Sequence, residues 1–332
     1  MTTNLVAPQT RRSLLTAVGA AGAYTLWPGR ASAQAWPSRP IRLVVPFAPG
    51  GSSEIVARAI AAELAKILGQ SVYVDNKPGG GGNVAMGEVA RADDQHTLIL
   101  GHIGTLAVNP FIFDKLPYDP VKDFRAISLL AKVPSLYVVP AELPVKNLKD
   151  FIALAKSKPG RLTYGSAGNG SAGHLAMEHL KMVSDIFILH VPFRGTGPQL
   201  TDLLAGRLDI AAVGAPAILQ HIKSGKLRCI ATGSTQRIAQ LPDVATVAEQ
   251  GYPGFEMTQW YGLLAPASLS AAAADKLAVA TAKAVQSPES LARLQTDAAI
   301  PVGGTPAEFT RFIADEQRRW RPVLVRAKVK PD

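Results

Sequence analysis

The feature that most constrains the fold is an alternation, from Ile41 onward, of short β-rich apolar runs with Ala-rich stretches of helical spacing. Residues 41–45 predict a buried strand that ends at Pro46, and residues 52–54 predict the N-terminal cap of a helix over 55–68. The next predicted elements are a strand, a helix and a strand over 71–75, 83–92 and 97–100. This βαβαβ order predicts an α/β fold with a doubly wound sheet.

The alternation recurs in the second third of the chain, which predicts a second α/β unit of similar size. Its predicted strands cover 136–139, 161–164, 187–191, 210–213 and 228–232, and its predicted helices cover 148–157, 171–183, 197–205 and 217–224. The tail is predicted to be helical over 271–286 and 306–326, without a strand pair of its own. We therefore expect the tail to return to the first unit.

This return makes the chain cross between the units twice, near residues 127–134 and 255–266. Two parallel crossings allow closure about one axis and restrict twist, as a hinge-bending clamshell requires. We predict domain I over 34–131 and 257–332 and domain II over 132–256, with a ligand cleft between them.

The first 33 residues have the pattern of an export signal. A twin-arginine motif, Arg11-Arg12, precedes an apolar run of small residues that ends at Leu26, and Ala31-Ser32-Ala33 matches a cleavage signature. The run is too short to cross a bilayer, which needs about 20 residues. We predict export by the twin-arginine route, cleavage after Ala33 and periplasmic localisation.

The charge balance does not predict a polyanionic partner. The 35 basic and 25 acidic side chains give a formal net charge of +10, and loss of Arg11, Arg12 and Arg30 with the signal lowers it by three, to +7. No basic run is interleaved with aromatic residues, so no nucleic-acid partner is predicted. The single cysteine, Cys229, allows no internal disulfide and predicts an inert thiol inside an apolar strand.

The sequence predicts neither a cofactor nor a metal site. Gly168 to Gly173 match G-x-G-x-x-G, but no acidic residue stands about 20 positions further on to hold a ribose. His174 and His179 are five positions apart and point to different faces of a helix, which disfavours chelation. We expect His174 to position a loop instead.

Three glycine-rich turns, residues 46–53, 165–171 and 192–197, each follow a predicted strand and precede a predicted helix. Such turns lie at the carboxyl ends of strands, where α/β sheets bind ligands, and the free N–H groups at a helix start favour an anion. Together they predict a carboxylate site. Glycines that merely permit tight turns remain the alternative for each of them.

The sequence contains no evident catalytic constellation. A G-x-S-x-G elbow is missing at Ser166, because Tyr164 occupies the position of the first glycine. A periplasmic serine hydrolase that uses Ser166 or Ser171 stays open as an alternative. On the second crossing, Trp260 and Tyr261 predict either packed aromatic residues or a wall of the cleft.

Eight motifs in order resemble the Bug-type solute receptors of tripartite tricarboxylate transporters. They are IRLVVPFAPGG at 41–51, NKPG at 76–79, Gly104-Thr105 with Asn109-Pro110, LPYDP at 116–120 with Asp123-Phe124, YGSAG at 164–168, HLA at 174–176, HVPFRG at 190–195 and DLLAG at 202–206. The resemblance runs from about Pro37 to the C-terminus.

The resemblance implies a non-enzymatic periplasmic binding protein, a type II-like clamshell whose domains are doubly wound sheets flanked by helices. Such a receptor would bind a small carboxylate and deliver it to the membrane permease subunits, or signal to a sensor protein in the alternative role. We expect a monomer without a cofactor. The ligand-binding residues implied are Phe47, Ala48, Gly51, Ser52, Ser53, Thr105, Ser166, Gly168, Asn169, Ser171, Thr196 and Asp209.

The sequence departs from the family pattern at two places. Glu54 stands where Asp is common, and we expect it to cap a helix. Phe193-Arg194 stands where Tyr-Lys is common. Arg194 has a planar guanidinium group where the family has the ammonium group of a lysine. This group favours bidentate contact with a carboxylate if the side chain faces the cleft.

Overall fold

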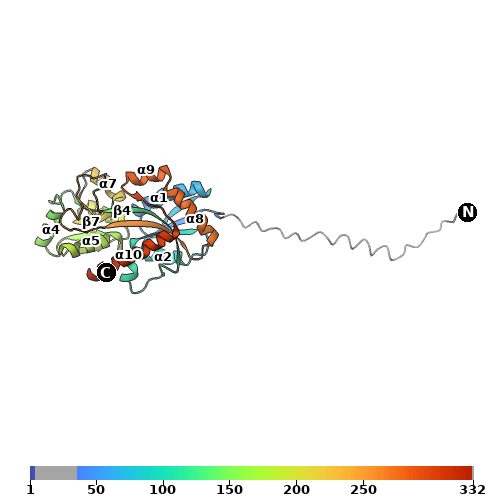
Figure 1. Ribbon diagram of the computed structural model, residues 1–332, viewed down its shortest axis with the longest axis horizontal. Helices are drawn as coiled ribbons and strands as arrows, with labels where there is room; N and C mark the ends of the chain where they lie inside the picture. The colour runs from blue at the N-terminus through green and yellow to red at the C-terminus, as the bar shows by residue number, and fades with distance from the viewer. Residues whose placement is uncertain (4–35, 331–332) are drawn as a thin grey trace. The chain divides into compact units, whose positions relative to one another are not determined.

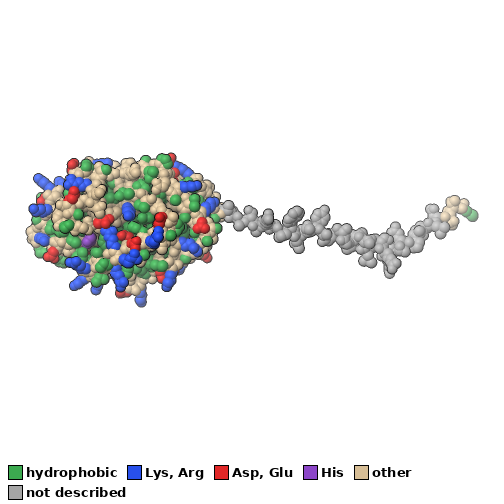
Figure 2. Space-filling model, viewed as in Figure 1, with side chains coloured by type: hydrophobic (Ala, Val, Ile, Leu, Met, Phe, Trp, Pro, Cys, Tyr) green, Lys and Arg blue, Asp and Glu red, His purple; other side chains and the backbone are tan. Residues whose placement is uncertain are grey.

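The computed structural model describes residues 1–3 and 36–330 (Figure 1). The predicted signal motif and cleavage site fall within 4–35, outside these residues. The chain from Arg39 onward forms one compact unit, here called the larger unit. In the described part of the chain, no helix is both long and apolar enough to cross a membrane. Basic and acidic side chains are interspersed on the face of the larger unit that Figure 2 shows.

The first part of the larger unit has the predicted βαβαβ order. Strands β1 (Ile41–Val45), β2 (Val72–Asn76) and β3 (Thr97–His102) are connected by helices α1 (Ser52–Leu68) and α2 (Asn83–Ala90). β1 lies in the middle and pairs in parallel with both neighbours. Its side chains are almost all buried, as expected for an apolar strand covered by helices on both faces.

Strand β4 (Phe124–Pro140) is 17 residues long and joins both parts of the sheet. As far as Pro134 it pairs antiparallel with β9 (Thr258–Pro266). From Ser135 it pairs antiparallel with β7 (Ile210–Gly214) and β8 (Leu227–Thr232). The predicted strand over 136–139 is therefore wrong in length. The partner β9 is far away along the chain, so no local pattern indicated the pairing.

The second part of the unit also follows the predicted alternation. Strand β5 (Thr163–Ser166) pairs in parallel with β6 (Leu189–Pro192) and with β7. The helices are α4 (Leu148–Ser157), α5 (Ala172–Ser184), α6 (Thr196–Leu204) and α7 (Ala215–Lys223). The strand order is β2-β1-β3-β9-β4-β7-β5-β6, with β8 and the short β10 (Ile300–Pro301) also paired to β4. This mixed, helix-flanked sheet confirms the predicted α/β class.

The tail contains the two predicted helices, α8 (Ala271–Val285) and α10 (Pro306–Arg326), and two elements that were not predicted. These are α9 (Pro288–Thr296) and the short β10, which pairs with β4 and not with another strand of the tail, so the tail has no strand pair of its own within the described residues. α10 packs against β9, where the ring of Trp260 contacts Phe309 and Phe312. Trp260 Nε1 also donates to Glu316 at 2.8 Å.

Candidate functional site

The turn after β1 contacts the turn after β6. Ala48 N donates to Arg194 O at 3.2 Å. A Cβ atom on Gly195 would lie 2.7 Å from Ala48 N, and one on Gly197 would lie 2.4 Å from Pro49 O. Real Cβ atoms do not approach so closely, so glycine is required where these two backbones meet.

The turn after β5 meets the glycine segment before α2 and the start of α3 (Asn109–Ile112). A Cβ atom on Gly81 would lie 2.0 Å from Asn169 O, and one on Gly170 would lie 2.0 Å from Asn109 Oδ1. Asn109 Nδ2 donates to Gly81 O at 3.1 Å and holds the glycine segment in place. The three glycine-rich turns therefore meet along one cleft, at the carboxyl ends of β1, β5 and β6.

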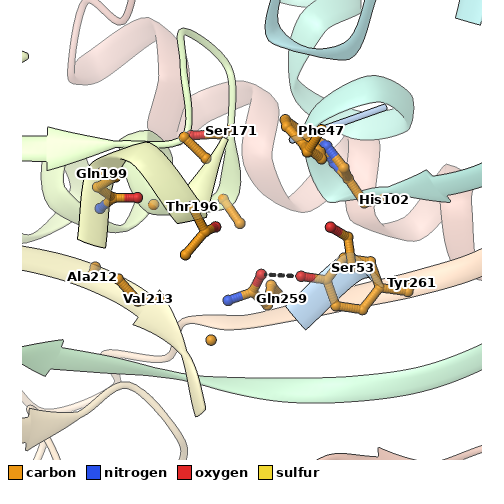
Figure 3. Close-up of a pocket in the computed structure, with 14 residues that line it drawn as sticks. Phe47, Ser53, His102, Ser171, Thr196, Gln199, Ala212, Val213, Gln259 and Tyr261 are labelled. Carbon is orange, nitrogen blue, oxygen red and sulfur yellow. Dashed lines mark hydrogen bonds between the residues drawn. The ribbon is translucent and has the colours of Figure 1, made fainter. Parts of the chain in front are cut away.

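A small cavity of about 30 Å³, here called the inner cavity, lies between these walls (Figure 3). Figure 3 shows Ser171, Thr196 and Gln199 on one side and Phe47, His102 and Ser53 on the other. Within the described part of the chain, no residue that lines it is an acid, a lysine or an arginine. The lining residues with polar side chains are Ser53, His102, Ser171, Thr196, Gln199, Gln259 and Tyr261.

The start of α1 brings two hydroxyl groups to the cleft. The N-cap residue is Gly51, without a side-chain cap bond, so the serines of the predicted Ser-Ser-Glu cap do not cap the helix. Glu54 does not cap it either: its Oε2 accepts from the N–H of Gly50, the residue before the N-cap, at 2.8 Å and ties the turn to the first turn of the helix. Ser53 consequently lines the inner cavity, and Ser52 Oγ is buried without a hydrogen-bond partner within the described protein.

His102, the last residue of β3, forms part of the wall of the inner cavity. Its ring stacks on Phe47, with the centroids 4.6 Å apart. Its Nδ1 accepts from Gly104 N (2.6 Å) and Thr105 N (3.2 Å), so the ring proton is on Nε2. Complete burial lowers the pKa of His102 to about 3, which keeps the ring neutral. Nε2–H has no partner within the described protein and is a neutral donor.

Gln259 and Tyr261 reach the inner cavity from β9. Tyr261 Oη donates to Gln259 Oε1 at 2.6 Å, which leaves the NH₂ group of Gln259 as a donor. Burial raises the pKa of Tyr261, so its hydroxyl is neutral. An unpaired buried polar atom costs about 1 to 3 kcal/mol. His102 Nε2 is such an atom and belongs to a residue that lines the inner cavity, which indicates a place that receives a polar group, whereas Ser52 and Asn109, which also have an unpaired side-chain oxygen, line neither cavity.

A second cavity of about 340 Å³, here called the outer cavity, adjoins the inner one, because Phe47 and Ala167 line both. Arg194 belongs to its lining and, among the residues that the structure describes, is the one with a charged side chain that lines either cavity. The other lining residues are Gly79, Gly80, Gly81, Gly82, Phe113, Gly168, Asn169, Pro192 and Phe193.

Ser166, His174 and His190 support the turn after β5. Ser166 Oγ lies 2.7 Å from His190 Nε2 and also accepts from Gly168 N at 3.1 Å. His174 Nδ1 accepts from Gly170 N at 3.1 Å, which confirms that His174 positions a loop. The rings of His174 and His190 stack 4.3 Å apart. Ser166 is fully buried and lines neither cavity, so the Ser–His pair lies behind the cleft wall.

The residues implied by the family resemblance are not all in one place. Phe47, Ser53, Ser171 and Thr196 line the inner cavity, and Phe47, Gly168 and Asn169 line the outer one. Ala48 and Gly51 belong to the contacting turn, while Ser52, Thr105 and Ser166 are buried beside it. Asp209 lies outside both cavities, where its Oδ2 accepts from Thr163 N (2.7 Å) and Oγ1 (3.1 Å).

Sequence reasoning missed His102, Gln199 and Gln259 and left Tyr261 undecided. In β9, Gln259 and Tyr261 line the inner cavity and Trp260 packs against α10 on the opposite face. Successive side chains of a strand point to opposite faces, so a prediction of β9 as a strand would have placed Gln259 and Tyr261 on one face and Trp260 on the other. His102 could have been noticed as a polar residue at the carboxyl end of an apolar strand.

The sequence matches a known family over most of its length. The model of the "Tripartite tricarboxylate transporter family receptor" matches residues 56–328. Protein BugT of Bordetella pertussis is 35% identical to this chain over 295 residues, which cover 88% of this chain and 90% of BugT.

Solved structures agree with this match. Rpa4515 of R. palustris, determined with adipate, has a TM-score of 0.86 and 35% identity, covering 90% of this chain and 100% of its own. MatC from Rhodopseudomonas palustris, determined with bound malate, has a TM-score of 0.83 and 34% identity, covering 87% of this chain and 100% of its own. The resemblance seen in the sequence is confirmed, and the chain belongs to the tripartite tricarboxylate transporter receptor family.

Proposed function

We propose that this protein is a periplasmic solute-binding receptor that captures a small carboxylate-bearing ligand and delivers it to a tripartite tricarboxylate-type permease. The observation that supports this most is the inner cavity, where neutral donors from both cleft walls converge between three glycine-rich turns. The relatives determined with adipate and malate support a carboxylate as the ligand class.

The proposed mechanism is closure of two domains, 34–131 with 257–332 and 132–256. β4 and β9 are the segments that connect them, and β4 exchanges one set of pairing strands for another between Pro134 and Ser135. A ligand that contacts both walls binds the closed state more tightly than the open state and shifts the equilibrium toward it. The permease would then receive a closed receptor.

The chemistry of the inner cavity suits reversible capture. Hydroxyl, amide and imidazole N–H groups can each donate to a carboxylate, and a hydrogen bond to a charged group contributes about 1.5 to 3 kcal/mol. A buried lysine or arginine that lost its partner when the ligand departs would be costly, and the described lining of the inner cavity contains neither residue. We assign the ligand contacts to Ser53, His102, Ser171, Thr196, Gln199 and Gln259, beside Phe47. Tyr261 orients Gln259 by donating its hydroxyl proton to Gln259 Oε1.

Calorimetry of the protein from Gln34 onward tests this proposal. Mono-, di- and tricarboxylates and aromatic acids are titrated at equal ionic strength, and at least one is expected to bind with measurable heat. Compaction on ligand addition, measured by small-angle X-ray scattering, tests closure. Absence of heat with every anion would contradict the proposed function.

Export is proposed to follow the twin-arginine route, with cleavage after Ala33 and a monomeric mature protein. N-terminal sequencing of the periplasmic form would give Gln34 as its first residue. Replacing Arg11 and Arg12 by Lys is expected to retain the protein in the cytoplasm. Secretion of that variant at the normal level would contradict this route.

The Ser166–His190 contact is the observation that favours a hydrolase as the second candidate. A nucleophile has to reach its substrate, and Ser166 is fully buried outside both cavities. We expect no turnover of ester substrates. Hydrolysis that Ser166→Ala abolishes would reverse this ranking.

A further inference from the structure

The turn between α9 and β10, residues 295–299, is held at both ends by the proposed domain I. On one side α9 packs against α1 (Figure 1). On the other side Pro301 of β10 pairs with Ala131, and Val302 N donates to Leu130 O at 3.1 Å. Helix α1, Leu130 and Ala131 all belong to this domain, so the ends of the turn move with it.

The middle of the same turn is inserted into the proposed domain II. Ala298 is 7% exposed and belongs to an apolar cluster whose other described members all come from domain II, among them Leu136 and Ile238. Gln240 of domain II donates from its Nε2 to Gln295 O at 2.5 Å. The turn therefore adds a third link between the proposed domains, beside β4 and β9.

The backbone of Ala298 is held in an unfavourable conformation. Its φ is +57°, in the left-handed region. A residue with a Cβ atom disfavours this region and persists there only where surrounding contacts hold it, whereas glycine adopts it freely. The contacts of the Ala298 methyl group with domain II are contacts of this kind.

A cavity of about 480 Å³ lies beside the turn and leaves it room to move. Its walls come from the turn and β10 on one side and from residues 234–240 on the other, and they include Pro134, where β4 changes its pairing partners. Among the described residues, none lines both this cavity and the inner or the outer one. The third link thus lies at the hinge and is separate from the place proposed for the ligand.

We propose that residues 295–299 form a latch that stabilises the closed receptor, and that Gln240 and Ala298 are positioning residues that set ligand affinity without contacting the ligand. The inference rests on the proposed function, which supplies the closing movement. Because domain I holds both ends of the turn, opening of the cleft pulls Ala298 and the Gln295 carbonyl away from domain II. The closed state has these contacts and the open state lacks them, so they favour closure.

Variants on the two sides of the latch test this inference in the proposed mature protein. Gln240→Ala removes the donor to Gln295 O. Ala298→Gly removes the buried methyl group but also the strain of the positive φ, so its unfolding midpoint should stay close to that of the parent. The matched controls, Gln236→Ala and Ala239→Gly, change exposed residues of the facing loop. Thermal unfolding checks that each variant is folded.

Calorimetry measures the affinity for adipate, for malate and for whichever carboxylate of the panel binds the parent most tightly, and stopped-flow fluorescence measures dissociation. Each latch variant should bind about fivefold more weakly, as the loss of one neutral contact implies, mainly through faster dissociation. The controls should stay within twofold of the parent. An affinity within twofold of the parent in either latch variant, or equal losses in the controls, would overturn the inference and leave the proposed function standing. Failure of every carboxylate to bind the parent would overturn both.

Discussion

The two cavities of the cleft differ in what they offer a ligand. The inner cavity is small, buried and lined by neutral hydrogen-bonding groups, whereas the outer cavity is larger, walled by aromatic rings and contains Arg194. A buried charge without a partner is costly, while an exposed arginine stays hydrated when no ligand is bound. Neutral hydrogen-bonding groups therefore line the inner cavity, and the positive charge of Arg194 lies at the outer one.

Acidification should have the largest effect, a fall in the free energy of unfolding, because the inner cavity stays neutral only while the buried ring of His102 is unprotonated. Burial lowers the pKa of His102 and of His174 to about 3 and that of His179 to about 4. An unfolded histidine has a pKa of about 6.5. Below that value the unfolded state binds more protons, so the free energy of unfolding falls until the folded-state pKa is reached. We expect a loss of about 2 kcal/mol per histidine between pH 7 and pH 5, measured by urea denaturation.

The variant His102→Gln provides the control for this prediction. Glutamine can still accept from Gly104 N and Thr105 N but does not titrate. The decline of unfolding free energy with pH should therefore be smaller by about 2 kcal/mol than in the parent. A decline identical to that of the parent would mean that His102 does not stay neutral in the folded protein.

Closure can be blocked at one point of contact between the walls. Gly197 lies in α6 without a positive φ, so alanine suits its own helix, but its Cβ would lie 2.4 Å from Pro49 O on the opposite wall. Gly197→Ala should reduce ligand affinity roughly tenfold to hundredfold, in line with an overpacking cost of 1 to 3 kcal/mol, without loss of thermal stability. Pro198→Ala, at the exposed neighbouring position, is the control. Unchanged affinity in Gly197→Ala would show that these walls do not need to meet.

The sequence predicts most of the local structure and part of the cleft. The strand at 41–45 and the helices at 148–157 and 306–326 have the predicted bounds, because their apolar spacing and flanking residues are local signals. The three glycine-rich turns also meet, as predicted from their place after strands. The long pairing of β4 with β9 could not be predicted, since neither strand contains the information about its partner.

The polar residues of the inner cavity could not be predicted from local sequence either. Gln199 lies within α6 and Gln259 within β9, and their neighbours in sequence explain neither. Gln199 is buried and donates to Gly165 O at 3.0 Å, a contact with a strand that only the folded chain brings near. For Asp209 the family resemblance predicts a ligand contact, and the structure places this residue outside both cavities with a hydrogen bond from Thr163.

A smaller effect is expected from removing one hydroxyl group of the inner cavity. Thr196→Val keeps the shape of the side chain and deletes its donor at the cavity wall. Calorimetry should show about a tenfold loss of affinity for carboxylates. Thr201→Val changes an exposed threonine of the same helix and should leave affinity within twofold. Similar losses in both variants would indicate an effect on α6 as a whole and would remove Thr196 from the ligand site.

The smallest effect on binding is expected at Asp209, the implied site residue that lies outside both cavities. Asp209→Asn weakens the acceptor of two hydrogen bonds from Thr163 while keeping the side-chain shape. The free energy of unfolding should fall by about 1 kcal/mol, since one charged acceptor becomes neutral. Ligand affinity should stay within twofold, because neither Asp209 nor Thr163 lines either cavity. A tenfold loss of affinity with an unchanged unfolding midpoint would mean that the ligand reaches the region beside β5 and β7, and the division into an inner and an outer cavity would then be incomplete.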